Sequence, residues 1–153
     1  MDIKEKIHSL SEDLLKNIER LVVIDSQLGT PAEGMPFGPG PAKALDEALS
    51  IARELGFKTV NLDNYCGYAE IGEGDDIVGI AGHLDIVPAG GDWTYDPFAL
   101  TRKGDYVYGR GTTDDKGPVL EALYAMKLLR DSGIRLNKRV RLIMGCNEET
   151  GSR

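Results

Sequence analysis

Apolar residues recur at steps of three and four positions in two parts of the chain, which is the spacing of one face of an α-helix. The first part predicts a helix with an apolar stripe made of Ile3, Ile7, Leu10, Leu14, Ile18 and Leu21. Ser9 and Glu12 have the spacing of a capping box, which favours a helix start at Ser9 instead. The second predicted helix opens at Pro41, ends at Gly56 and has an apolar face made of Leu45, Leu49, Ala52 and Leu55.

Residues 29–41, which separate these helices, are dense in Gly and Pro and predict a loop. A phosphate-binding loop is the alternative, but no Gly-Lys-Ser/Thr sequence follows. After this second helix the apolar pattern shortens to the period of strands, at residues 57–62, 65–71 and 77–81. The turn at residues 72–76 predicts a hairpin between the last two. The run at 77–81 is almost wholly apolar, so we expect a strand that is covered on both faces.

The remaining elements are a long loop, a short strand at residues 106–108, a third helix and a last strand at residues 140–146. The helix opens at Gly117 or Pro118, runs to Asp131 and is apolar nearly all round, so we expect it to be well buried. Strands that alternate with helices predict the α/β class with a covered sheet.

The composition narrows the class of protein. The chain has 153 residues, enough for one domain, and is 41% hydrophobic and 28% charged, as in soluble globular proteins. Its net charge of -7 argues against a nucleic-acid-binding face. No apolar run is long enough to span a membrane, and the charged N-terminus lacks a signal-peptide core. Cys66 and Cys146 are read as unpaired thiols in a reducing compartment, so a cytoplasmic protein is expected.

Polar residues that can carry chemistry follow two predicted strands. In α/β sheets, sites form beyond the C-terminal ends of strands. His83 and Asp85 follow the strand at 77–81, and their spacing of two directs both side chains to one side. An imidazole that binds a metal, with a carboxylate to orient it, fits this pair. A buried histidine hydrogen-bonded to a nearby acid is the commoner alternative.

Two further acidic pairs extend this pattern. Asp114 and Asp115 stand where a loop enters the third helix, and helix capping is an alternative that could account for one of them, Asp115. A second carboxylate beside it adds repulsion that a cation would relieve. Glu148 and Glu149 follow the last strand, so one could bind a metal while the other holds a water. An imidazole with several carboxylates suits zinc, and manganese or cobalt could bind the same set.

The segments GHLDIVPAGGDWTYDPF, YGRGTTDDKGP and NEETGS resemble those of the two-zinc metallopeptidase family of aminoacylases and carboxypeptidases. The likeness is strongest to its dipeptidase branch, the dipeptidase V-like and carnosinase-like enzymes. It implies that His83 binds one zinc, Glu149 binds the other and Asp114 bridges the two. It also implies that Asp85 orients His83, that Glu148 is the general base, and that the Asp114–Asp115 peptide bond is cis. Asp115 receives no metal role.

The resemblance also sets the expected fold and function. Residues 1–153 are expected to be the N-terminal portion of a zinc-peptidase catalytic domain, with a mixed sheet flanked by helices. Family members carry a further carboxylate ligand, a late histidine ligand, and a lid or dimerisation domain, and His8 in the first helix is the only other histidine here. The expected activity is hydrolysis of dipeptides or short peptides, with this chain inactive alone and its oligomeric state open. An N-acyl amino acid deacylase or desuccinylase, or a non-catalytic fragment, are the alternatives.

Overall fold

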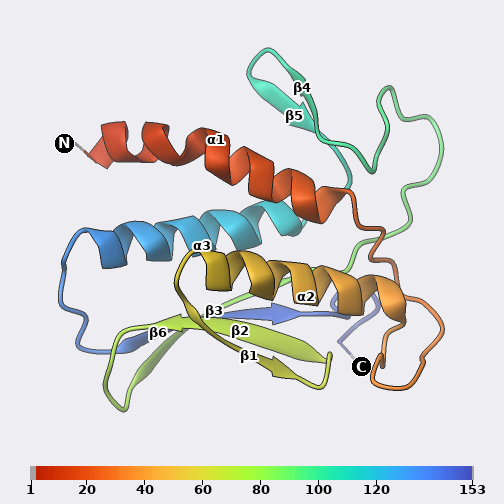
Figure 1. The fold of residues 1–153 in the computed structure, drawn as a ribbon. Coiled ribbons are helices and arrows are strands. Elements are labelled where there is room, and N and C mark those ends of the chain that lie inside the picture. Colours follow the sequence, from red (N-terminus) through yellow and green to blue (C-terminus); the bar gives the residue numbers. More distant parts are fainter. Residues whose placement is uncertain (1–2, 153) are drawn as a thin grey trace.

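The computed structural model describes residues 3–152, so Met1 and Arg153, the ends of the expected domain, lie outside the described residues (Figure 1). The elements follow in the order α1 (Ile3–Val22), α2 (Pro39–Glu54), β1 (Lys58–Leu62), β2 (Cys66–Ile71), β3 (Ile77–His83), β4 (Thr101–Lys103), β5 (Tyr106–Tyr108), α3 (Lys116–Asp131) and β6 (Arg139–Gly145).

The main sheet has the strand order β1-β2-β6-β3 and is mixed. Strand β2 is antiparallel to both β1 and β6, whereas β3 is parallel to β6. Helix α2 packs on β1 and β2, helix α3 packs on β3 and β6, and α1 lies across both helices on the side away from the sheet (Figure 1). The predicted mixed α/β fold is confirmed, with the described helices on one face of the sheet.

Side-chain alternation along the strands explains this layering. In β6, Leu142 and Met144 are buried, whereas Ile143 between them is 38% exposed. Successive strand residues point to opposite faces, so one face of β6 meets the helices and the other does not. The helix layer contributes the rest of the core, including Leu45, Leu49, Leu120 and Leu123, which are all at most 1% exposed.

Two predictions about β3 are wrong. Residues 72–76 do not form a hairpin turn, because β6 lies between β2 and β3. Strand β3 is also not covered on both faces, since Ile77 is 43% and Val78 48% exposed. Within residues 3–152 it pairs with β6 alone and packs on one helix layer. An apolar run indicates that a strand can be buried. It does not show which elements will cover that strand, because those elements come from distant parts of the chain.

The helix predictions need three corrections. Helix α1 begins at Ile3, and the Ser9 hydroxyl donates to the carbonyl of Lys6 within the helix, so the capping box is wrong. Helix α2 begins at Pro39. Helix α3 is buried along one side only, because Leu129 on its other side is 40% exposed.

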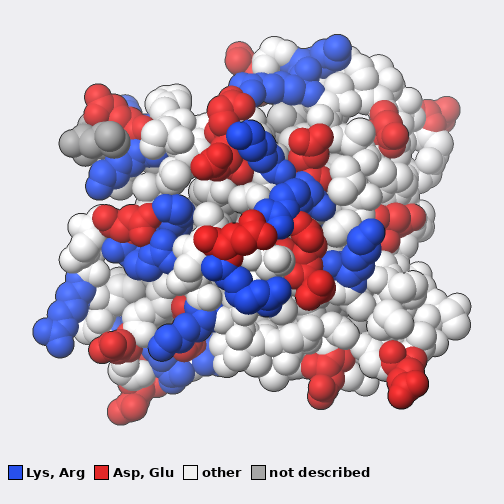
Figure 2. Space-filling model, viewed as in Figure 1, with Lys and Arg blue, Asp and Glu red and all other residues white. Residues whose placement is uncertain are grey.

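Two further properties bear on the class of protein. Among residues 3–152, no helix combines the length and apolar character that crossing a membrane requires. On the face seen in Figure 2, acidic and basic side chains are interspersed, with no broad area of basic charge alone.

Candidate metal centre

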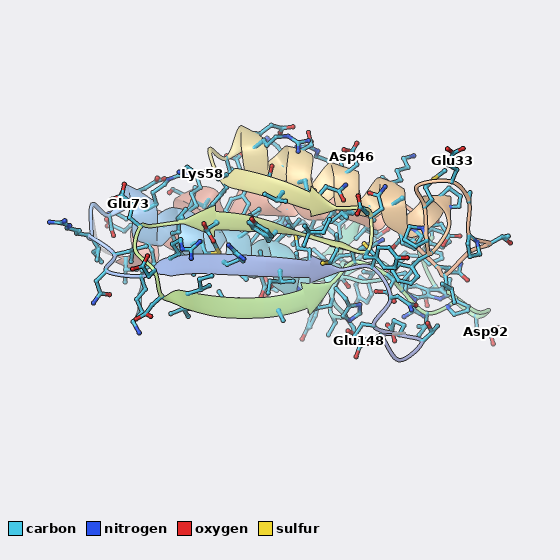
Figure 3. The ribbon with its side chains drawn as sticks, turned by 90° about the horizontal axis from the view of Figure 1, so that it is seen from below. Glu33, Asp46, Lys58, Glu73, Asp92 and Glu148 are labelled. Atoms are coloured by element: carbon cyan, nitrogen blue, oxygen red, sulfur yellow. The ribbon has the colours of Figure 1, made fainter. Side chains whose placement is uncertain are left out.

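The candidate site lies where two parallel strands end together. His83, the last residue of β3, is in register with Gly145, the last residue of β6, so the two strand exits are neighbours. The N-terminus of α3 brings Asp114 to the same place. In Figure 3, Glu148 lies at this end of the sheet together with Asp92 and far from Glu73, which lies at the opposite end. Parallel pairing therefore assembles the site from segments that are distant in sequence.

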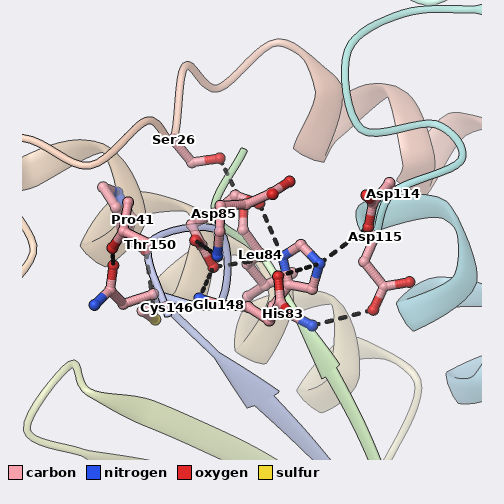
Figure 4. Close-up of polar contacts among 12 residues, drawn as sticks. Ser26, Pro41, His83, Leu84, Asp85, Asp114, Asp115, Cys146, Glu148 and Thr150 are labelled. Atoms are coloured by element: carbon pink, nitrogen blue, oxygen red, sulfur yellow. Dashed lines mark hydrogen bonds and ion pairs between the residues drawn. The ribbon is translucent and has the colours of Figure 1, made fainter. Parts of the chain in front are cut away.

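His83 is held by acidic groups on both sides of its ring (Figure 4). Its Nε2 lies 3.0 Å from Oδ1 of Asp114 and 3.8 Å from Oε2 of Glu148. Its Nδ1 lies 3.0 Å from the carbonyl oxygen and 3.4 Å from Oδ1 of Asp85. Burial disfavours the charged ring, but the Asp85 charge and the hydrogen bond to Asp114 outweigh it and raise the pKa of His83. The ring is therefore oriented through Nδ1, and Nε2 faces the carboxylates.

Asp85 joins the two strand exits. Its side chain is buried, and its two carboxylate oxygens accept the main-chain N–H groups of Glu148 and Glu149, each at 3.0 Å. These charge-assisted hydrogen bonds hold the chain after β6 against the chain after β3. Asp85 lies beside the His83 ring, as expected, and it also holds the main chain of both glutamates, which the sequence reading did not foresee.

Three side chains meet the distance requirement for a shared cation. His83, Asp114 and Glu149 each offer one ligand atom, and these atoms lie within 4.8 Å of one another. Partial burial, followed by the nearby Asp114 charge, raises the pKa of Glu149. Nitrogen and carboxylate donors converge here and the carboxylates outnumber the imidazole, so the residues fit a divalent metal such as zinc.

An open cleft of about 730 Å³ adjoins these residues. His83, Asp114 and Glu148 line one part of it, and Phe37 and Tyr65 line another. The two aromatic rings make an edge-to-face pair with centroids 5.4 Å apart. The cleft gives a small polar molecule access to the acidic cluster and offers an aromatic wall beside it.

The Asp114–Asp115 loop is tightly folded. Its peptide bond is cis, as the resemblance implies. A side chain at Gly117 would meet the carbonyl oxygen of Thr112 at 2.0 Å, so the loop closes on itself only because Gly117 has none. Asp115 occupies the N-cap position of α3, but its side chain makes no capping hydrogen bond. The alternative that Asp115 caps the helix through its side chain therefore does not hold.

Two supporting residues were missed by the sequence reading. Lys116 is fully buried, and its ammonium donates to the carbonyl oxygens of Leu21 at 2.9 Å and Ile24 at 2.7 Å, which ties the loop to the end of α1. Ser26 is fully buried and its hydroxyl donates to the carbonyl of Leu84 at 2.6 Å, between His83 and Asp85. Lys116 lies inside the GTTDDKGP segment, but a lysine normally signals a solvated surface, and no pattern marks Ser26.

The sequence is similar to those of known peptidases. Residues 79–153 match the family model described as peptidase family M20/M25/M40. The Beta-Ala-Xaa dipeptidase of Lactobacillus delbrueckii subsp. lactis is 42% identical over 153 residues, covering 98% of this chain and 33% of that protein. YtjP of Bacillus subtilis, provisionally named a dipeptidase, is 43% identical over 141 residues, covering 91% of this chain and 30% of that protein.

Solved structures share the fold. Human carnosine dipeptidase 1 superposes with a TM-score of 0.82 at 27% identity, covering 97% of this chain and 34% of that one. The metallo-carboxypeptidase Sso-CP2 of Sulfolobus solfataricus has a TM-score of 0.74 at 28% identity, covering 91% of this chain and 32% of that one. This chain therefore spans about a third of the length of these relatives. The matched segment, which is just under half of this chain, the dipeptidase relatives and the common fold together confirm the resemblance to peptidase family M20/M25/M40.

Proposed function

We propose that this chain is part of a metal-dependent dipeptidase and that its acidic cluster holds the metal. The observation that carries the proposal is the convergence of His83, Asp114 and Glu149, which come from three separate segments of the chain. Relatives named as dipeptidases favour a short peptide as the substrate over the N-acyl amino acids of the deacylase alternative.

The proposed metal content is two zinc ions, with manganese or cobalt as substitutes. His83 would bind one zinc, Glu149 the other, and Asp114 both. When bound, the metals would polarise the scissile carbonyl and lower the pKa of a bound water. We also propose that residues 1–153 are the N-terminal portion of the catalytic domain. The remaining ligands would then lie in the two thirds of the relatives' length that this chain does not span.

The other two residues have roles that follow from their contacts. Asp85, buried and within 3.4 Å of Nδ1 of His83, would hold the imidazole with Nε2 toward the metal. The side chain of Glu148 is 60% exposed and lines the cleft 3.8 Å from Nε2 of His83. It is therefore free to take a proton from a water beside the metal and to pass it to the leaving amine, which is the work of a general base and acid.

A chimera tests the proposal. This chain would replace the matching third of the Lactobacillus Beta-Ala-Xaa dipeptidase, to which it aligns over 153 residues. We expect hydrolysis of a β-alanyl dipeptide that stops with chelator and returns with zinc. His83→Ala should abolish the activity, whereas His8→Ala, the matched control on α1, should not. A folded, zinc-loaded chimera that cleaves N-acyl amino acids and no dipeptide would refute the dipeptidase assignment.

A further inference from the structure

Asp115 stands at a helix start and does not behave as a helix cap. Asp is favoured at N-cap positions because its carboxylate accepts free N–H groups of the first turn. Here the carboxylate turns away from α3, and its Oδ2 accepts the main-chain N–H of His83 at 3.1 Å, 32 positions earlier in the chain (Figure 4). The carboxylate of Asp115 therefore makes no hydrogen bond to the first turn of α3 and binds the last residue of β3 instead.

The end of β3 and the start of α3 approach each other so closely that residue 82 has no room for a side chain. A side chain at Gly82 would meet Oδ2 of Asp115 and Cγ2 of Val119, each at 2.6 Å. Gly82 therefore lets the helix start approach the strand end until the carboxylate reaches the amide of His83. The separation of the two elements at this point is set by that hydrogen bond and by the packing of Val119, which is 2% exposed.

The hydrogen bond from His83 to Asp115 is the second link between His83 and the start of α3. The main chain of His83 is tied to Asp115, and the ring of His83 is in contact with Asp114, the preceding residue, at 3.0 Å. Lys116, the next residue, is anchored to the carbonyls at the end of α1. The position of Asp114 relative to His83 is thereby fixed from both sides.

We propose that Asp115 is a positioning residue of the metal centre, which sets the distance between His83 and Asp114 by accepting the main-chain N–H of His83. The inference rests on the proposed metal centre. Asp115 touches no metal in this arrangement and acts through the two residues that do. Loss of a residue that orients a ligand typically lowers metal affinity about 10- to 100-fold.

The test uses two substitutions that separate positioning from helix capping. Asp115→Ser retains a good N-cap residue, but its short hydroxyl cannot span the distance to the His83 amide. Asp115→Asn keeps an acceptor oxygen at the same reach and loses the charge. Asp105→Ala, an exposed acid between β4 and β5, controls for the change in net charge. Each substitution is made in the chimera described above, which supplies the remaining ligands. Each chimera is titrated with Co²⁺ alone, and the visible absorption of the bound ion reports both affinity and ligand geometry.

We expect Asp115→Ser to fold, to bind Co²⁺ about 10- to 100-fold more weakly with an altered spectrum, and to exchange the His83 amide proton faster. Asp115→Asn should restore most of the affinity, and Asp105→Ala should match the unsubstituted chimera. Asp115→Ser with unchanged Co²⁺ affinity, spectrum and amide exchange would overturn this inference and leave the metal centre standing. An unsubstituted chimera that binds no Co²⁺ would overturn the metal centre and this inference with it.

Discussion

Raising the pH should stabilise this protein through one buried side chain, Lys116. Its ammonium is buried at the junction of α1 and α3, where it donates to the carbonyls of Leu21 and Ile24. Burial lowers the pKa of Lys116 from 10.5 to about 8, with the charge of Asp25 acting in the opposite direction. The folded protein therefore carries a charge that its surroundings disfavour at neutral pH.

The sign and size of the effect follow from proton linkage. Between about pH 8 and pH 10.5 the unfolded chain holds the lysine proton and the folded chain releases it, so the free energy of unfolding rises with pH. Over the whole titration of Lys116 the free energy of unfolding rises by about 3 kcal/mol, and about 2 kcal/mol of this rise falls between about pH 7.5 and pH 10. Below about pH 7 both states are protonated, and the contribution of Lys116 no longer changes.

Urea unfolding, monitored by circular dichroism at each pH, gives the free energy of unfolding. The contribution of Lys116 is the difference in this free energy between the original chain and Lys116→Met. Methionine removes the titrating group and keeps an unbranched side chain of similar length. Burial raises the pKa of the Cys146 thiol to about 12, which makes stability fall as pH rises above 9, but this loss occurs in both proteins and cancels. Lys43→Met, which removes an exposed lysine of α2, is the control. A difference between the original chain and Lys116→Met that stays constant within about 0.5 kcal/mol from about pH 7.5 to pH 10 would refute the reasoning.

Three further outcomes are expected. In the chimera, Glu148→Gln should retain zinc and lose about 10²- to 10⁴-fold in turnover, because it removes a proton acceptor and no metal ligand; near-normal turnover would contradict that role. Met144→Ala should lower the free energy of unfolding by about 2–5 kcal/mol in urea titrations, whereas Ile143→Ala, on the opposite face of β6 and 38% exposed, should cost clearly less. The isolated chain, Met1 to Arg153, should show no dipeptide hydrolysis and weak zinc binding by calorimetry, since His83, Asp114 and Glu149 leave each of two metals with only two ligands; chelator-sensitive turnover would contradict this.

Local sequence patterns determined the elements and much of the candidate site. Three- and four-residue apolar spacing predicted the three helices, and Gly56, at a φ of 86°, ends α2 as expected. Short apolar runs predicted β1, β2, β3, β5 and β6. These signals are readable because they depend on neighbours within a few residues. The local order placed His83 and Glu149 at strand exits, which a parallel pair brings together. Their assignment as ligands came from the family resemblance. Their metal-binding roles stay predictions.

The tertiary structure alone decided how these elements meet. The sequence reading placed β2 beside β3, but β6 comes between them, because strand pairing is chosen by long-range contacts that no local pattern encodes. Strand β4 was missed, since three residues are too few to show a period. Likewise, Asp115 has the residue type and position of a helix cap, and Lys116 has the residue type of a solvated surface. The partner of Asp115 is an amide 32 positions away, and a partner of Lys116 is a carbonyl 95 positions away. Only folding brings these groups within hydrogen-bond distance.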